Sequence, residues 1–139
     1  MYYIEDIYRR GDVLESISGL PDNVLGFTAR GNITSEDYET VLIPAVEEKL
    51  KQFEKVRLLY HLGEEFEGFQ ARAMWDDAKV GLAHITEWEK IAIVTDVNWI
   101  RDAGKIFGFV IETMSVPGDV KVFHNSELDD AVIWIGEDW

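Results

Sequence analysis

The spacing of hydrophobic and polar residues changes several times along the chain, and each spacing predicts a helix or a strand. Two short runs of strand-forming residues come first, at 13–18 and 24–30. A cluster of turn formers at 19–23 separates them, and Gly31 ends the second run. Because the connection is short, the two runs predict an antiparallel hairpin.

A helix is predicted directly after this hairpin. Thr34 and Asp37 have the spacing of a capping-box variant, and apolar residues then recur at helical spacing from Tyr38 to Phe53. Pro44 lies inside this pattern. It is expected to kink or split the helix, because proline has no backbone N–H to donate.

Strands and helices alternate over the rest of the chain. Nearly continuous apolar runs predict buried strands, which are typical of parallel sheets. The predicted elements are, in order, strand 56–62, loop 63–69, helix 70–88, strand 90–95, helix 97–110 capped by Asp96, strand 120–123, and a helix that Ser126 opens and Gly136 stops.

This order predicts an α/β fold in one domain. The sheet is expected to be mixed and mostly parallel, with five strands and a cover of about four helices. A chain of 139 residues is long enough for one self-sufficient core and too short for two. The domain is predicted over residues 13–139, with residues 1–12 as an N-terminal extension.

Charge excludes one class of partner. The net charge is −14 and is shared equally between the two halves of the chain, which is typical of an acidic, solubilising coat. Nucleic acid is therefore rejected as a partner. There is no cysteine, no apolar run long enough to span a bilayer and no secretory leader, so we expect a cytoplasmic protein without a transmembrane segment.

No motif points to catalysis, and we expect no enzyme, no cofactor and no metal. None of the serines stands in a nucleophile elbow. His61 lies near Glu64, which leaves a metal site conceivable, but a hydrogen-bonded histidine at a strand end is favoured. Asp76 and Asp77 are interpreted as acids near a helix start, where the helix dipole favours negative charge.

Large apolar side chains gather on the two middle helices and at their ends. Such side chains most often fill a core, but they also line ligand pockets and interfaces. If they line a pocket, the candidate ligand-binding residues are Met74, Trp75, Leu82, Trp88, Trp99 and Phe107.

Four segments together resemble a known family. They are Leu20-Pro21-Asp22-Asn23-Val24-Leu25-Gly26-Phe27, Thr34-Ser35-Glu36-Asp37-Tyr38-Glu39 with Leu42-Ile43-Pro44-Ala45, Ala73-Met74-Trp75-Asp76-Asp77-Ala78-Lys79, and Glu87-Trp88-Glu89-Lys90-Ile91-Ala92. In this order they resemble the SpoIIAA-like family of the STAS type, over about residues 13–135. The resemblance implies a mixed sheet with packed helices. CRAL-TRIO domains share that architecture and bind lipids in a pocket under a mobile helical gate.

The resemblance implies two functional directions. Anti-sigma antagonists are switched by phosphorylation of a serine that follows the third strand, but residues 63–85 contain no Ser, Thr or Tyr. A protein-interaction regulator would therefore lack this switch, with Glu64, Glu67 and Asp76 as candidate contact residues. The preferred direction is binding of a hydrophobic small molecule or lipid between helices 70–88 and 97–110, with transient contact to a membrane surface. We also expect a homodimer, from the general frequency of such assemblies.

Overall fold

The computed structural model describes residues 13–115 and 118–137, so the extension predicted at 1–12 lies outside the described residues. It shows a five-stranded sheet in the order β1-β2-β3-β4-β5. The strands are β1 (Val13–Ser16), β2 (Val24–Ile33), β3 (Val56–Phe69), β4 (Trp88–Thr95) and β5 (Asp119–Phe123). β1 pairs antiparallel with β2, and the other pairs are parallel, which confirms the predicted fold class.

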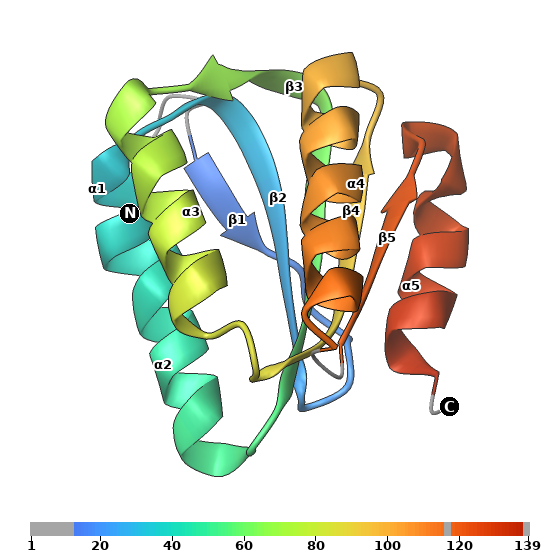
Figure 1. Ribbon diagram of the computed structural model, residues 1–139. Helices are drawn as coiled ribbons and strands as arrows, with labels where there is room; N and C mark the ends of the chain where they lie inside the picture. The colour runs from blue at the N-terminus through green and yellow to red at the C-terminus, as the bar shows by residue number, and fades with distance from the viewer. Residues whose placement is uncertain (1–12, 116–117, 138–139) are drawn as a thin grey trace.

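The helices alternate with the strands as predicted (Figure 1). They are α1 (Ser35–Asp37), the π-helical turn η1 (Tyr38–Leu42), α2 (Ile43–Gln52), α3 (Ala71–Ala83), α4 (Asn98–Thr113), the 3₁₀ turn η2 (Asn125–Glu127) and α5 (Leu128–Gly136). Each parallel strand lies beside its predecessor. Right-handed crossovers therefore place α2, α3 and α4 on one face of the sheet, and α5 covers the other.

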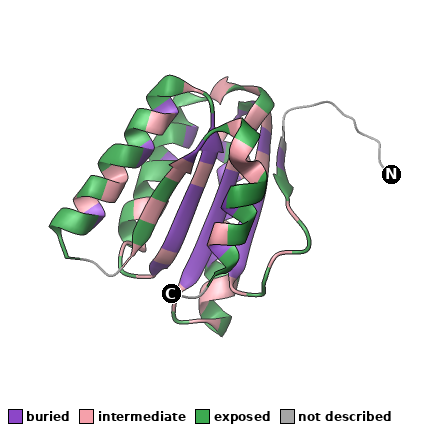
Figure 2. Cartoon of the chain, turned by 90° about the vertical axis from the view of Figure 1, so that its right-hand side faces the viewer, coloured by how far each residue is buried: buried purple, intermediate pink, exposed green. Residues whose placement is uncertain are grey.

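The alternation of β3 side chains separates two cores. Tyr60 and Leu62 point into the larger core, beneath the helices from η1 to α4. Leu59 points the other way, into a smaller core that includes Ala131 and Ile135 of α5. Figure 2 shows the buried central strands between helices whose outer faces are exposed. Both faces of β4 and of the first half of β3, residues 56–62, are covered, which explains their nearly continuous apolar sequences.

The first helix begins at the predicted cap and is split before Pro44. The Asp37 N–H donates to Thr34 Oγ1 at 3.2 Å, and the Thr34 N–H donates to Asp37 Oδ2 at 2.8 Å. The irregular turn η1 follows, where the Ile43 N–H bonds the Tyr38 carbonyl. Pro44 then occupies the first turn of α2, a position that needs no N–H donor.

The loop predicted at 63–69 is wrong, because β3 continues to Phe69. Its second half pairs with β2, where Gly31 lies opposite Phe66 and Ile33 opposite Phe69. Gly31 has a φ of 67°, and the register shifts beside it, so β2 continues past the glycine that was expected to end it.

The helix predicted at 70–88 is too long. α3 ends at Ala83, and the Glu87 N–H donates to the His84 carbonyl in a turn. Trp88 therefore begins β4 and is only 2% exposed. Its indole N–H donates to the Gly81 carbonyl at 3.2 Å, which ties the turn to the end of α3. α3 begins at Ala71, so Asp76 and Asp77 lie beyond its first turn, and the dipole interpretation of both acids is wrong.

Two predicted helix caps are also wrong. Val97 occupies the N-cap position of α4, and the Asp96 carboxylate instead accepts from the Asn125 N–H at 3.1 Å. The C-terminal helical segment is capped by His124, whose N–H donates to the Glu127 side chain at 2.7 Å, rather than by Ser126. Gly136 is the last residue of α5 and not the residue after it.

Two buried cations hold the end of α5 against the sheet. Arg57 on β3 is 5% exposed and donates to the carbonyls of Ile135 at 2.8 Å and Glu137 at 2.7 Å. Lys90 on β4 is 2% exposed and donates to the carbonyls of Trp134 at 2.9 Å and Glu137 at 2.6 Å. Cations at a helix C-terminus satisfy its orphan carbonyls and complement its dipole.

Candidate functional site

An apolar cavity of about 390 Å³ lies between α3, α4 and the sheet. Its floor is formed by side chains of β3 and β4, such as Leu58, Tyr60 and Ile91, and its sides by the two helices. Small residues on the helices, such as Ala78, Gly81 and Ala103, leave this space open. The structure thus places a cavity between the same two helices that the sequence singled out.

Five of the six candidate ligand-binding residues line this cavity. Met74 and Leu82 come from α3, Trp88 from the start of β4, and Trp99 and Phe107 from α4. The sixth residue, Trp75, does not line it and is 65% exposed. The difference follows from the pitch of α3, since adjacent residues on a helix point about 100° apart.

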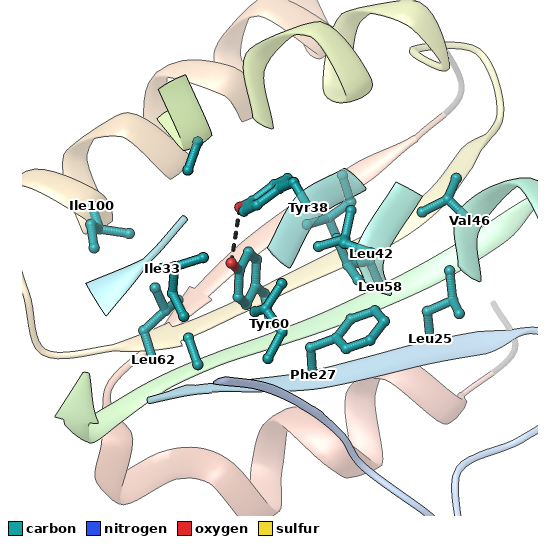
Figure 3. Packing of buried hydrophobic residues seen from close by; sticks show 14 of the residues in the cluster. Leu25, Phe27, Ile33, Tyr38, Leu42, Val46, Leu58, Tyr60, Leu62 and Ile100 are labelled. Atoms are coloured by element: carbon teal, nitrogen blue, oxygen red, sulfur yellow. Dashed lines mark hydrogen bonds between the residues drawn. The ribbon is translucent and has the colours of Figure 1, made fainter. Parts of the chain in front are cut away.

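A hydrogen-bonded chain of three side chains borders the cavity, and sequence reasoning missed it. The Tyr38 hydroxyl lies 2.9 Å from the Tyr60 hydroxyl (Figure 3) and donates to Asp77 Oδ1 at 2.8 Å. A tyrosine hydroxyl has one proton, so Tyr60 donates to Tyr38 and Tyr38 donates to Asp77. Tyr60 and Asp77 line the cavity, and Tyr38 lies fully buried behind them.

The surroundings shift the pKa of each member of this chain. Burial raises the pKa of Tyr38 and of Tyr60, and the negative charge of Asp77 adds to both shifts, so both hydroxyls stay protonated. Burial also raises the pKa of the Asp77 carboxyl, against the opposing effect of the hydrogen bond from Tyr38. Asp77, on α3, is nevertheless exposed to solvent.

The residues predicted for a protein interface lie apart from the cavity. Glu64 and Glu67 are exposed on the second half of β3. Asp76 is only 8% exposed, and its Oδ2 accepts from the Ser35 hydroxyl at 2.5 Å, so this carboxylate joins α3 to α1. The three acids therefore do not form one surface patch of similar exposure.

His61 is hydrogen-bonded as expected, but it lies inside β3 and not at a strand end. Its Nδ1 lies 3.3 Å from Thr28 Oγ1, and partial burial lowers the pKa of the imidazole. Over residues 13–115 and 118–137, no three His, Asp or Glu side chains gather closely enough to hold a metal ion. Within the same part of the chain, no helix has the length and apolar content that crossing a bilayer requires.

Comparison with known proteins shows which family has this architecture. One similar solved structure is the crystal structure of an uncharacterised protein of the DUF3478 family with a SpoIIAA-like fold, from Shewanella loihica PV-4. It is 26% identical, with a TM-score of 0.65 over 94% of this chain and 99% of that one. No curated protein matches the sequence significantly. Residues 24–136 match the SpoIIAA-like family, and the chain therefore belongs to it.

Proposed function

We propose that this protein is a non-enzymatic, cytoplasmic binding module that holds a hydrophobic small molecule or lipid in the cavity between α3 and α4. The observation that carries the proposal is the cavity itself. Its volume of about 390 Å³ falls within the range of roughly 300–1,000 Å³ that is typical of small-molecule sites. Its walls are mostly apolar, with a few polar side chains among them, as is typical of such sites.

The mouth of the cavity is also apolar. Met74, Leu82 and Trp99 line the cavity and are nevertheless 46%, 59% and 49% exposed. A hydrophobic ligand would cover these side chains as it enters, and this burial would favour binding by about 25 cal/mol for each Å² removed from water. The same side chains would make the apolar contact in a transient association with a membrane surface.

A cavity-filling variant tests the proposal. Purified protein is extracted with organic solvent for mass spectrometry, and the emptied protein is titrated with short-chain lipids while tryptophan emission is recorded. Ala78 lines the cavity, so Ala78→Phe should fill it and weaken binding at least tenfold. Ala83 lies on the same helix and outside the lining, which makes Ala83→Phe the matched control. Empty extracts together with unchanged emission would refute ligand binding.

A second candidate function is a protein-interaction regulator without the phosphoserine switch, acting as a homodimer or on another protein. The observation that favours it is the exposure of Trp75, Ile106 and Phe109, at 65%, 63% and 66%. Sedimentation of the purified chain measures self-association. Pull-down from the native cytoplasm measures binding to another protein, and Trp75→Ala or Glu67→Lys should remove a stoichiometric partner. A monomer that captures no stoichiometric partner would exclude this function.

A further inference from the structure

We infer that the cavity selects a ligand whose apolar body ends in a hydrogen-bond donor, above all a protonated amine, and that Asp77 is the residue that selects it. The inference rests on the proposed function, because it names the chemical class of ligand for that cavity. It follows from which polar atoms of the lining are already engaged and which are free.

The donors at the inner part of the cavity are already used within the protein. The Tyr60 hydroxyl gives its proton to Tyr38, since Tyr38 gives its own to Asp77. The Trp88 indole N–H is bonded to the Gly81 carbonyl. Of the lining side chains with polar atoms, that leaves the Trp99 indole, which is half exposed at the mouth.

The acceptors, in contrast, have capacity left. Asp77 Oδ1 accepts from Tyr38, whereas no described residue donates to Asp77 Oδ2. The Tyr60 oxygen keeps lone pairs after donating its proton. The polar part of the cavity therefore presents acceptor atoms on apolar walls, and a ligand that brings a donor completes the hydrogen bonding there.

The charge of the ligand's polar group decides how strongly it binds Asp77. An ammonium group would form a charge-assisted hydrogen bond with the Asp77 carboxylate, which is about twice as strong as a neutral one. A hydroxyl would form the weaker bond. A carboxylate would bring a second negative charge against Asp77, in a protein whose net charge is already −14. The expected order of affinity is amine, alcohol, carboxylate.

Three ligands with one chain length test this order. Octylamine, 1-octanol and octanoate are titrated calorimetrically into the full chain at neutral pH, below the concentrations at which they aggregate. The amine should bind about tenfold more tightly than the alcohol, and octanoate should bind most weakly. Asp77→Asn keeps an acceptor oxygen for Tyr38 but removes the charge. This variant should abolish the amine's advantage and strengthen octanoate, with 1-octanol changed less than threefold.

Two further variants complete the design. Asp77→Ser removes the charge with a different side chain, so it tests the same order of affinity if Asp77→Asn folds poorly. Asp130→Asn removes one charge from α5, on the opposite face of the sheet, and should leave the order unchanged. If none of the three ligands binds, the proposed function fails. If they bind but octanoate is tightest, or if the Asp77 variants keep the amine's advantage, the inference is overturned and the proposed function stands.

Discussion

Asp77 is the one acidic side chain among the described residues that line the cavity between α3 and α4. Its carboxyl group loses part of its hydration beside the apolar lining, and the hydrogen bond from Tyr38 at 2.8 Å compensates for only part of this loss. Residues that break a local rule in this way are concentrated at functional sites. A leucine at this position would pack against the same walls without that desolvation, so the acid is better explained by what it binds.

The raised pKa of Asp77 predicts a pH dependence of folding stability. The carboxyl titrates near 3.8 in the unfolded chain and at a higher pH in the folded protein. Below pH 3.8 both states are protonated and stability is full, and it falls as the pH rises through the folded-state pKa. Asp77→Asn cannot lose this proton. Urea unfolding from pH 3 to 8 should therefore show equal stabilities at the acidic end and a more stable variant at neutral pH. Parallel curves for the two proteins would contradict the argument.

The sequence predicts the apolar part of the site better than its polar part. Large side chains such as Met74 and Phe107 follow helical periodicity, so the sequence predicts that they come together between two helices. Tyr38 and Tyr60 belong to apolar patterns too, and periodicity does not show which hydroxyls meet. Asp77 lies six residues after the first residue of α3, and no local pattern shows that its carboxylate meets Tyr38. The polar chain joins three elements, and only the folded structure brings them together.

Among the elements, β3 and α5 show what local patterns miss. The second half of β3 contains Glu64, Glu65 and Glu67, a composition typical of loops, yet pairing with β2 makes it a strand. The long-range partner overrides the local propensity. The C-terminus of α5 likewise depends on Arg57 and Lys90, residues about 45–80 positions away in the sequence. Such contacts leave no signal at the helix itself.

Removing one of these cations should loosen α5. Lys90→Met keeps the length of the side chain but removes the ammonium that donates to the carbonyls of Trp134 and Glu137. Among the described residues, the Trp134 carbonyl then keeps only the Glu137 N–H, and the Glu137 carbonyl keeps only Arg57. A hydrogen bond to a charged group contributes about 1.5–3 kcal/mol, so the free energy of unfolding should fall by about that amount. Chemical denaturation measures the loss, and hydrogen exchange should show it in α5. Lys105 is exposed on α4, and Lys105→Met should change stability by less than about 0.5 kcal/mol. Equal effects of the two substitutions would refute the capping role.

Gly118, directly before β5, lies close to the backbone of Trp88. A Cβ atom on Gly118 would lie 2.6 Å from the Trp88 carbonyl oxygen, which is backbone and cannot rotate away. Gly118→Ala should therefore destabilise the protein by about 1–3 kcal/mol. On Gly136 the nearest atom is Pro21 Cγ at 3.6 Å, an ordinary contact, so Gly136→Ala serves as the control. Thermal unfolding of both variants measures the difference, and a neutral Gly118→Ala would show that the backbone there relaxes.

For the whole molecule, the net charge of −14 acts against anionic surfaces. Association with vesicles through the apolar mouth should be weaker when the vesicles contain about 30% anionic lipid than when they are wholly zwitterionic. Added salt should reduce this difference, because the Debye length shortens to about 8 Å at 0.15 M. Vesicle co-sedimentation at two salt concentrations measures both effects. Tighter binding to the anionic vesicles would mean that a local feature outweighs the overall charge.

The neighbour-by-neighbour order of the sheet also has a consequence for synthesis on the ribosome. As the chain emerges, each strand from β2 onward finds its partner already present, so the face under α2, α3 and α4 closes step by step. The opposite face stays uncovered for longer, because its covering helix α5 comes after all five strands in the chain. Until α5 emerges, Leu59, Ala92 and Val94 lack their cover, and Arg57 and Lys90 lack the carbonyls that they bind. In the nascent protein, one face of the sheet is therefore packed and the other exposes apolar side chains. The interval before α5 docks is the time when a chaperone would have most to protect.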